Sequence, residues 1–283
     1  MPSSNHLRFG EQTLDLSRPR VMGILNVTPD SFSDGGMFVD RAKALDHARR
    51  MVADGADIVD IGGESTRPGA LPVPEDIELE RVVPLVETLA REGVRVCVDT
   101  VKPAVMRAAL AAGACMVNDV RALREPGAID AVAASKAAVC LMHMQGEPRT
   151  MQAEPIYGDV VREVRDFLVQ RALTCEGAGI ARDRIVLDPG FGFGKTVAHN
   201  LALLRSLAVL EATGYPVLVG ISRKSTLGQI TGRDVTQRVA ASVAAALAAV
   251  ARGAAIVRVH DVRETVDALT VWMAIERESE VNE

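Results

Sequence analysis

Residues 21–27, VMGILNV, are apolar at every position except one asparagine near the end. A strand with one face in water would alternate apolar and polar side chains, so this run predicts a strand that is covered on both faces, as parallel strands are. Seven further runs of this kind lie along the chain: DIVDIGG (57–63), VRVCVDT (94–100), CMVND (115–119), AVCLMHM (138–144), RIVLDPG (184–190), PVLVGIS (216–222) and IVRVH (256–260).

The segments between these runs are typical of amphipathic helices. Residues 40–55 and 74–93 are two examples, and each closes with the glycine that often follows a helix C-terminus. A strand followed by a helix, eight times over, predicts an α/β protein with a (β/α)8 TIM barrel. The alternative is a doubly wound open sheet, which normally has fewer strands and a phosphate-binding turn after the first one.

A short β-hairpin is expected before the barrel. Residues 6–16, HLRFGEQTLDL, read as two strands that turn at Gly10 and Glu11, and we expect them to cap the N-terminal end of the barrel. No linker or low-complexity segment interrupts the chain. We therefore expect a single domain over residues 1–283, with the barrel over about 21–277.

Composition excludes several classes of protein. The net charge of −5 and the 3% aromatic content argue against a nucleic-acid partner. The longest apolar run, residues 239–251, is too short to cross a membrane, and the first residues do not resemble a secretory signal. Four cysteines without a CxxC pair predict buried, reduced thiols, and hence a cytoplasmic protein.

Polar or charged residues stand at the end of every predicted strand. In a barrel these ends meet at one rim, where barrel enzymes carry their active sites. Helix caps alone would favour Ser, Thr, Asp and Asn, and would not explain four basic residues there. They are His143, Lys224, Arg258 and His260. The pattern predicts a ligand with several polar edges.

The charges suggest what this ligand contains. The cationic residues Arg67, Lys224, Arg258 and His260, with the hydroxyls of Ser65, Ser222 and Ser225, suit a phosphate or pyrophosphate. By contrast, Asp99, Asn118 and Asp188 would lie deep among apolar strand ends, where a carboxylate can accept from adjacent N–H groups of a flat ring such as an aminopyrimidinone.

The stretch 188–196, DPGFGFGKT, imitates two nucleotide motifs and fails both by one residue. A Walker A loop would need glycine where Pro189 stands, and a dinucleotide fingerprint would need glycine where Lys195 stands. The sequence also has no HExxH, spaced Cys/His set or Gly-x-Ser-x-Gly motif. Zinc chemistry and covalent catalysis are therefore not indicated.

Five segments together resemble the dihydropteroate synthases, a family of pterin-binding enzymes. They are MGILNVTPDSFSDGG (22–36), DIGGESTRPG (60–69), DPGFGF (188–193), SRKS (222–225) and RVHD (258–261), and the resemblance runs from about residue 21 to the last helix. It implies a transferase of folate biosynthesis that joins 6-hydroxymethyl-7,8-dihydropterin diphosphate to 4-aminobenzoate, giving 7,8-dihydropteroate and pyrophosphate. The diphosphate would leave first, and the amine would trap a pterin cation.

The resemblance also implies the roles of individual residues. The pterin would be held by Asp99, Asn118, Asp188 and Lys224. The diphosphate would be held by Asn26, Thr66, Arg258 and His260, with Asn26 also binding Mg²⁺. The aminobenzoate, and competing sulfonamides, would lie against Thr66, Arg67, Pro68, Phe193 and Ser225. Catalysis would rest chiefly on Lys224, Arg258, His260 and Asp99.

A homodimer is also implied, with the alanine-rich helix at 239–251 as a candidate surface; the same helix could equally well pack on its own barrel. Two rival functions stay open from the residues. One is a corrinoid-type pterin-dependent methyltransferase, which has no need of the STRPG, SRKS and RVH segments. The other is a non-catalytic pterin-binding protein, which would tolerate loss of the residues that hold the diphosphate.

Overall fold

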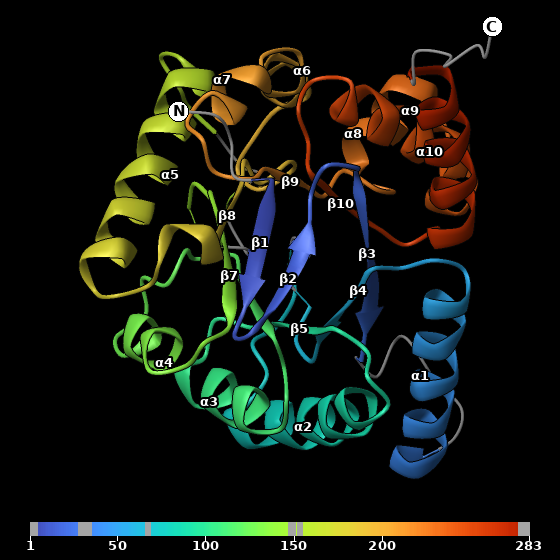
Figure 1. The fold of residues 1–283 in the computed structure, drawn as a ribbon. Coiled ribbons are helices and arrows are strands. Elements are labelled where there is room, and N and C mark those ends of the chain that lie inside the picture. The colour runs from blue at the N-terminus through green and yellow to red at the C-terminus, as the bar shows by residue number, and fades with distance from the viewer. Residues whose placement is uncertain (1–4, 28–35, 66–68, 147–150, 152–154, 277–283) are drawn as a thin grey trace, which may run out of the picture.

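The computed structural model describes residues 5–27, 36–65, 69–146, 151 and 155–276. Its main sheet has eight parallel strands in the order β8-β7-β6-β5-β4-β3-β10-β9, and a bridge between Leu187 and Val217 joins its two edges (Figure 1). The strands are β3 (Arg20–Asn26), β4 (Ile58–Gly62), β5 (Val96–Asp99), β6 (Met116–Asp119), β7 (Ala138–Met142), β8 (Ile185–Asp188), β9 (Leu218–Val219) and β10 (Ile256–Val259). The predicted barrel is confirmed, and the open sheet is excluded.

Each predicted strand forms, although β9 has only two residues of the seven expected. Pro216 has no N–H to give to a neighbouring strand, so regular pairing begins only after it. Its carbonyl still accepts from the Leu187 N–H at 2.9 Å, which helps to close the barrel.

Helices surround the barrel, as Figure 1 shows. They are α1 (Gly36–Ala53), α2 (Glu75–Arg91), α3 (Pro103–Ala111), α4 (Ala128–Ala133), α5 (Val160–Gly177), α6 (Val197–Arg205), α7 (Ala208–Glu211), α8 (Ser225–Thr231), α9 (Val239–Val250) and α10 (Val262–Glu276). Helix α2 shows why they form: Val82, Leu85, Val86 and Leu89 repeat at helical spacing and are all buried. Its acidic first turn complements the helix dipole.

The hairpin of β1 (His6–Phe9) and β2 (Gln12–Asp15) turns at Gly10, whose φ of +62° suits glycine. In Figure 1 it lies across the middle of the barrel. Its apolar side chains, Leu7, Phe9 and Leu14, form one cluster with inward-facing residues of all eight barrel strands. The expected cap is confirmed, and it fills the N-terminal end of the barrel interior.

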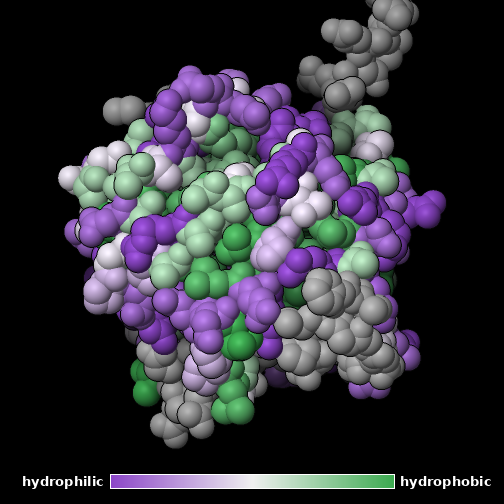
Figure 2. Space-filling view, turned by 90° about the horizontal axis from the view of Figure 1, so that it is seen from below, coloured by the Kyte–Doolittle hydropathy of each residue, from purple (hydrophilic) through white to green (hydrophobic). Residues whose placement is uncertain are grey.

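The prediction of buried thiols is confirmed for Cys97, Cys140 and Cys175, whereas Cys115 is only partly buried. The face shown in Figure 2 mixes hydrophilic and hydrophobic residues. All four cysteines are free, and burial raises the pKa of the Cys97 and Cys140 thiols well above the usual range. Within the described ranges, no helix is both long enough and apolar enough to cross a membrane. That residues 1–283 fold as one unit stays a prediction.

The hairpin should stabilise the whole barrel. Leu7 is fully buried in its cluster, so Leu7→Ala should lower the free energy of unfolding by about 2–5 kcal/mol in chemical denaturation. The control Leu173→Ala, at a side chain on α5 that is 49% exposed, should change it by about 0.5 kcal/mol or less. Equal effects of the two changes would show that the hairpin rests on the barrel without stabilising it.

Candidate active site

A partly buried arginine joins two carboxylates inside the barrel. Arg258 on β10 donates from Nε to Asp60 Oδ2 on β4 at 2.6 Å and from Nη2 to Asp99 Oδ2 on β5 at 2.7 Å. Asn118 on β6 donates from Nδ2 to the same Asp60 oxygen at 3.1 Å. One network of hydrogen bonds thus joins four strands.

The strand period explains why these side chains meet. Successive residues of a strand point to opposite faces. Ile256 on β10 and Ile58 on β4 belong to the interior cluster above the hairpin. Two residues further on, Arg258 and Asp60 must also point inward. The polar residues therefore form the next layer of the interior, toward the C-terminal ends of the strands.

The strand register places three of the predicted residues side by side. Asn26 pairs with Gly62, Gly62 with Asp99, and Asp99 with Asn118. A Cβ on Gly62 would stand 3.5 Å from the Asp99 Cβ and 3.7 Å from the Asn26 Oδ1. The glycine thus keeps open the space between the asparagine and the aspartate.

Two buried oxygens in this layer are hydrogen-bond acceptors that the described residues leave unsatisfied. Asp60 Oδ1 and Asn118 Oδ1 are buried and accept no hydrogen bond within the described part of the chain. A buried acceptor left in this state costs about 1–3 kcal/mol. The layer therefore suits a ligand that presents N–H groups.

Burial shifts the acid–base behaviour of the layer. It raises the pKa of Asp99 to about 7, against the attraction of Arg258. The pKa of Asp188 is raised for the same reason. Burial would lower the pKa of Arg258, but the Asp60 and Asp99 carboxylates more than offset it and raise that pKa further. The guanidinium therefore stays charged.

The far side of the layer is built by the loop after β8. Asp188 Oδ1 accepts from the Gly190 N–H at 2.7 Å. The Lys224 ammonium donates to the Phe191 carbonyl and lies 4.5 Å from the centre of the Phe193 ring. Burial lowers the pKa of Lys224 to about 8, while Asp188 opposes the shift. Asp188, Phe193 and Lys224 are thus brought together, as predicted.

The remaining predicted residues lie around this centre. The His260 Nδ1 is 3.1 Å from the Ser222 Oγ, which joins the ends of β9 and β10. Ser225, directly after Lys224, is exposed at the start of α8. Thr66, Arg67 and Pro68 lie outside the described residues.

Several known proteins are similar to this chain in sequence and in fold. The family model for pterin-binding enzymes matches residues 22–260. The dihydropteroate synthase of Escherichia coli K12 is 52% identical over 260 residues, 92% of each chain. Among solved structures, that of the Xanthomonas albilineans enzyme with 4-aminobenzoic acid has a TM-score of 0.92 and 54% identity, covering 98% of this chain and all of that one. The Yersinia pestis enzyme in a sulfonamide drug complex also has a TM-score of 0.92, with 52% identity over 96% of this chain and all of that one.

The chain belongs to the dihydropteroate synthase family. It is therefore a transferase of folate synthesis, as the resemblance implied. Neither the corrinoid-type methyltransferase nor the non-catalytic pterin-binding protein is favoured by these comparisons.

One expectation about the rim of this dihydropteroate synthase barrel is wrong. His143 does not converge with the other basic residues, because Cys140 and Met142 face inward and the strand period turns His143 outward. Its ring packs edge-on against Phe167 of α5, with 4.9 Å between centroids. Burial and the nearby Lys195 lower the pKa of His143 to about 3, so the ring is neutral.

Sequence reasoning also missed Asp60 as a site residue of the family barrel. Its side chain is fully buried between Arg258 and Asn118. The signal was present: in DIVDIGG a charged residue shares the inward parity of Ile58, and a buried charge needs a partner. The partner itself is 198 residues away, so the sequence alone could not supply it.

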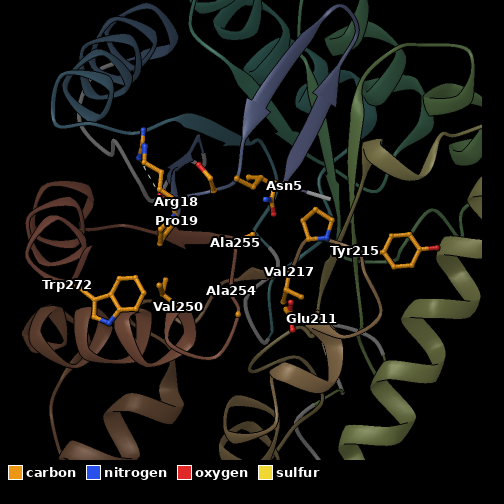
Figure 3. Close-up of a pocket in the computed structure, with 14 residues that line it drawn as sticks. Asn5, Arg18, Pro19, Glu211, Tyr215, Val217, Val250, Ala254, Ala255 and Trp272 are labelled. Atoms are coloured by element: carbon orange, nitrogen blue, oxygen red, sulfur yellow. Dashed lines mark hydrogen bonds between the residues drawn. The ribbon is translucent and has the colours of Figure 1, made fainter. Parts of the chain in front are cut away.

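A cavity of about 260 Å³ lies elsewhere on the molecule (Figure 3). Its lining includes Arg18 and Pro19, just before β3, and Ala254 and Ala255, just before β10, with Trp272 of α10 beside them. It therefore opens at the N-terminal end of the barrel and contains none of the predicted site residues. Barrel enzymes act at the other end, so we place the candidate site there.

The Asp60–Arg258 ion pair should contribute strongly to the free energy of unfolding. Asp60→Asn keeps the size of the side chain but removes its charge, and Arg258 would keep only Asp99. The free energy of unfolding should fall by about 1.5–3 kcal/mol in chemical denaturation. The control is Asp183→Asn, which weakens the exposed pair with Arg8 and should cost under about 1 kcal/mol. Similar losses in both variants would contradict a special role for the buried pair.

Proposed function

We propose that the chain condenses 6-hydroxymethyl-7,8-dihydropterin diphosphate with 4-aminobenzoate, giving 7,8-dihydropteroate and pyrophosphate. The main support for this proposal is the polar layer of the barrel interior, in which the buried Asn118 and Asp188 and the partly buried Asp99 lie next to an apolar layer. Family membership supports it, since the relatives described above are dihydropteroate synthases.

The pterin is held by Asp99, Asn118, Asp188 and Lys224. A pterin presents an amino group and a ring N–H side by side, and a carboxylate can accept from both. Asp188 uses Oδ1 for the Gly190 N–H and offers Oδ2 to the ring. Lys224, on the opposite side of the loop after β8, donates to the carbonyl edge.

The diphosphate is held by Asn26, Thr66, Arg258 and His260. Nε and Nη2 of Arg258 are bound to carboxylates, and Nη1 has no acceptor among the residues that the structure describes, so it can donate to a phosphate oxygen. His260 lies at the end of the same strand as Arg258, with its ring beside the Ser222 hydroxyl. Both groups stabilise negative charge on the leaving diphosphate.

Asn26 also supplies an oxygen ligand to Mg²⁺. An amide oxygen beside the open space over Gly62 suits a hard cation. Among the described residues no cluster of His, Cys, Asp and Glu could hold a metal alone, and Mg²⁺ is commonly held by one or two protein groups plus substrate phosphates. When bound, the ion would neutralise charge on the diphosphate.

Lys224, Arg258, His260 and Asp99 catalyse the reaction by stabilising the charges that form on the diphosphate and on the pterin. The C–O bond breaks first, the pair of electrons leaves with the diphosphate, and a delocalised pterin cation remains. Asp99 and its neighbouring carboxylates stabilise this cation. The neutral amine of the aminobenzoate then attacks, so no general base is needed on the protein.

The aminobenzoate lies against Phe193 and Ser225, with Thr66, Arg67 and Pro68 completing the pocket. Phe193 offers a ring wall next to the Lys224 ammonium, and Ser225 offers an exposed hydroxyl at the first turn of α8. A helix start and a hydroxyl suit a carboxylate. Sulfonamides present a similar aniline and acidic group, so they compete here.

We also propose that the protein is a homodimer and that it is located in the cytoplasm. The buried face of α9, which includes Ala245, Ala246 and Ala249, packs on its own barrel. Its neighbour α10 exposes Val271 and Ile275, so these two helices are the surface for a homodimer. The four free thiols are consistent with a reducing cytoplasm.

The decisive assay measures pyrophosphate release from the pterin diphosphate, with and without 4-aminobenzoate. We expect release that depends on both substrates and on Mg²⁺, with dihydropteroate formed in equal amount. Binding of the pterin without turnover would support the non-catalytic alternative, and methyl transfer from a pterin would support the methyltransferase.

Asp188→Asn should weaken pterin binding severely and leave the fold intact. An amide cannot accept from two adjacent donors as a carboxylate does, and removing one partner of a buried charged pair costs roughly 2–5 kcal/mol. Calorimetry with a phosphate-free pterin measures the change. Unchanged affinity in a folded variant would exclude Asp188 from the pterin site.

Pterin affinity should fall as the pH rises through about 8, because burial lowers the pKa of Lys224 to that value. Below it Lys224 is an ammonium that donates to the ligand; above it the charge is lost. Calorimetric titrations from acidic to alkaline pH would show the change. Lys224→Met is the control, since it keeps any titration of the ligand itself, and an identical pH dependence in the variant would contradict the assignment.

A further inference from the structure

The lysine of the stretch 188–196 has no role in the proposed reaction, yet it is among the most buried charged groups described. Lys195 is 3% exposed. Its ammonium lies 2.9 Å from the Gly190 carbonyl, 3.0 Å from the Phe193 carbonyl and 3.3 Å from the His143 carbonyl. It is also 3.0 Å from the His143 Nδ1. All four acceptors are uncharged.

Burial and these contacts shift the pKa values of both His143 and Lys195. The pKa of His143 is lowered to about 3, so the ring is neutral. When Lys195 carries its charge, the ammonium has no lone pair and the ring accepts from it through Nδ1. Burial lowers the pKa of Lys195 to about 7, with Asp188 opposing the shift. Burying an ammonium group is energetically unfavourable, so the surrounding structure must supply contacts that compensate for it.

The loop after β8 supplies such contacts. Gly190, Gly192 and Gly194 all have positive φ, at 67°, 77° and 63°. A Cβ on Gly190 would stand 1.9 Å from the His143 carbonyl oxygen, and one on Gly194 would stand 2.3 Å from that of Gln145. The glycines let the loop pack backbone to backbone on the end of β7, which brings its carbonyls toward one another. Lys195 neutralises this cluster of carbonyl dipoles.

Two residues whose carbonyls bind Lys195 also contact side chains of the proposed ligand site. The Gly190 N–H holds Asp188, while the Gly190 carbonyl binds Lys195. The Phe193 ring lies beside the Lys224 ammonium, while the Phe193 carbonyl binds Lys195. A shift of either carbonyl would therefore move a group that faces the ligand.

We propose that Lys195, braced by His143, is a positioning residue that fixes the loop after β8 and so holds Asp188, Phe193 and Lys224 in place for the pterin and the aminobenzoate. The proposal rests on the proposed function of the site. It gives the lysine a task that neither nucleotide motif could explain. Arg258 and His260 are tied to other partners, Asp60 and Ser222, so the diphosphate contacts should not depend on Lys195.

The test compares Lys195→Met with a matched buried cation. Arg184, 6% exposed, donates to the carbonyls of Ala137 at 2.7 Å and Val132 at 3.0 Å, away from the site. Both Lys195→Met and Arg184→Met should lower the melting temperature. Only Lys195→Met should weaken the binding of 6-hydroxymethylpterin, at least tenfold by calorimetry, and raise KM for aminobenzoate. Pyrophosphate affinity should stay within twofold of wild type in both.

Chemical rescue separates a missing ammonium from general damage. In Lys195→Ala, n-butylammonium should restore most of the lost pterin affinity, whereas n-butanol, of similar length but uncharged, should not. Pterin affinity within twofold of wild type in folded Lys195→Met would overturn the proposal. So would an equal loss in Arg184→Met.

Two further outcomes remain informative. Should Lys195→Met not fold, His143→Leu decides the matter: it removes one acceptor of four, and pterin affinity should fall about threefold, while an unchanged affinity would overturn the proposal. Failure of the wild-type protein to bind 6-hydroxymethylpterin at all would instead overturn the proposed function of the site.

Discussion

The two-residue period of the strands is the constraint from which the site follows. Every second residue of a closed barrel points inward, and the interior has room for only a few layers of side chains. The hairpin and an apolar layer fill the N-terminal end. The next inward positions toward the C-terminal end carry charge and amide groups, so the same alternation that builds the core also gathers the site.

Charge in that layer is kept in balance by one arginine. Without Arg258, Asp60 and Asp99 would be two carboxylates in a water-poor interior, which is strongly unfavourable. With it, the two acids and the amide of Asn118 are held by strands that are far apart in the sequence. The oxygens left over, Asp60 Oδ1 and Asn118 Oδ1, give the layer its preference for donors.

The loop after β8 uses a different device. Three glycines with positive φ allow close backbone packing, which a side chain at Gly190 or Gly194 would prevent. Close packing of carbonyls is unfavourable unless a cation lies among them, and Lys195 is that cation. The glycines thus serve backbone geometry, and Phe193 supplies a ring beside Lys224.

The barrel, the capping hairpin and most polar residues at the rim could be predicted from the sequence, because strand burial and helix period are local properties of the chain. The sequence did not determine the direction of His143, which depends on which residue of β7 faces inward. Nor did it reveal that Asp60 pairs with Arg258 or that Lys195 lies among three carbonyls. Those contacts depend on strand register and loop path, which only the closed tertiary structure decides.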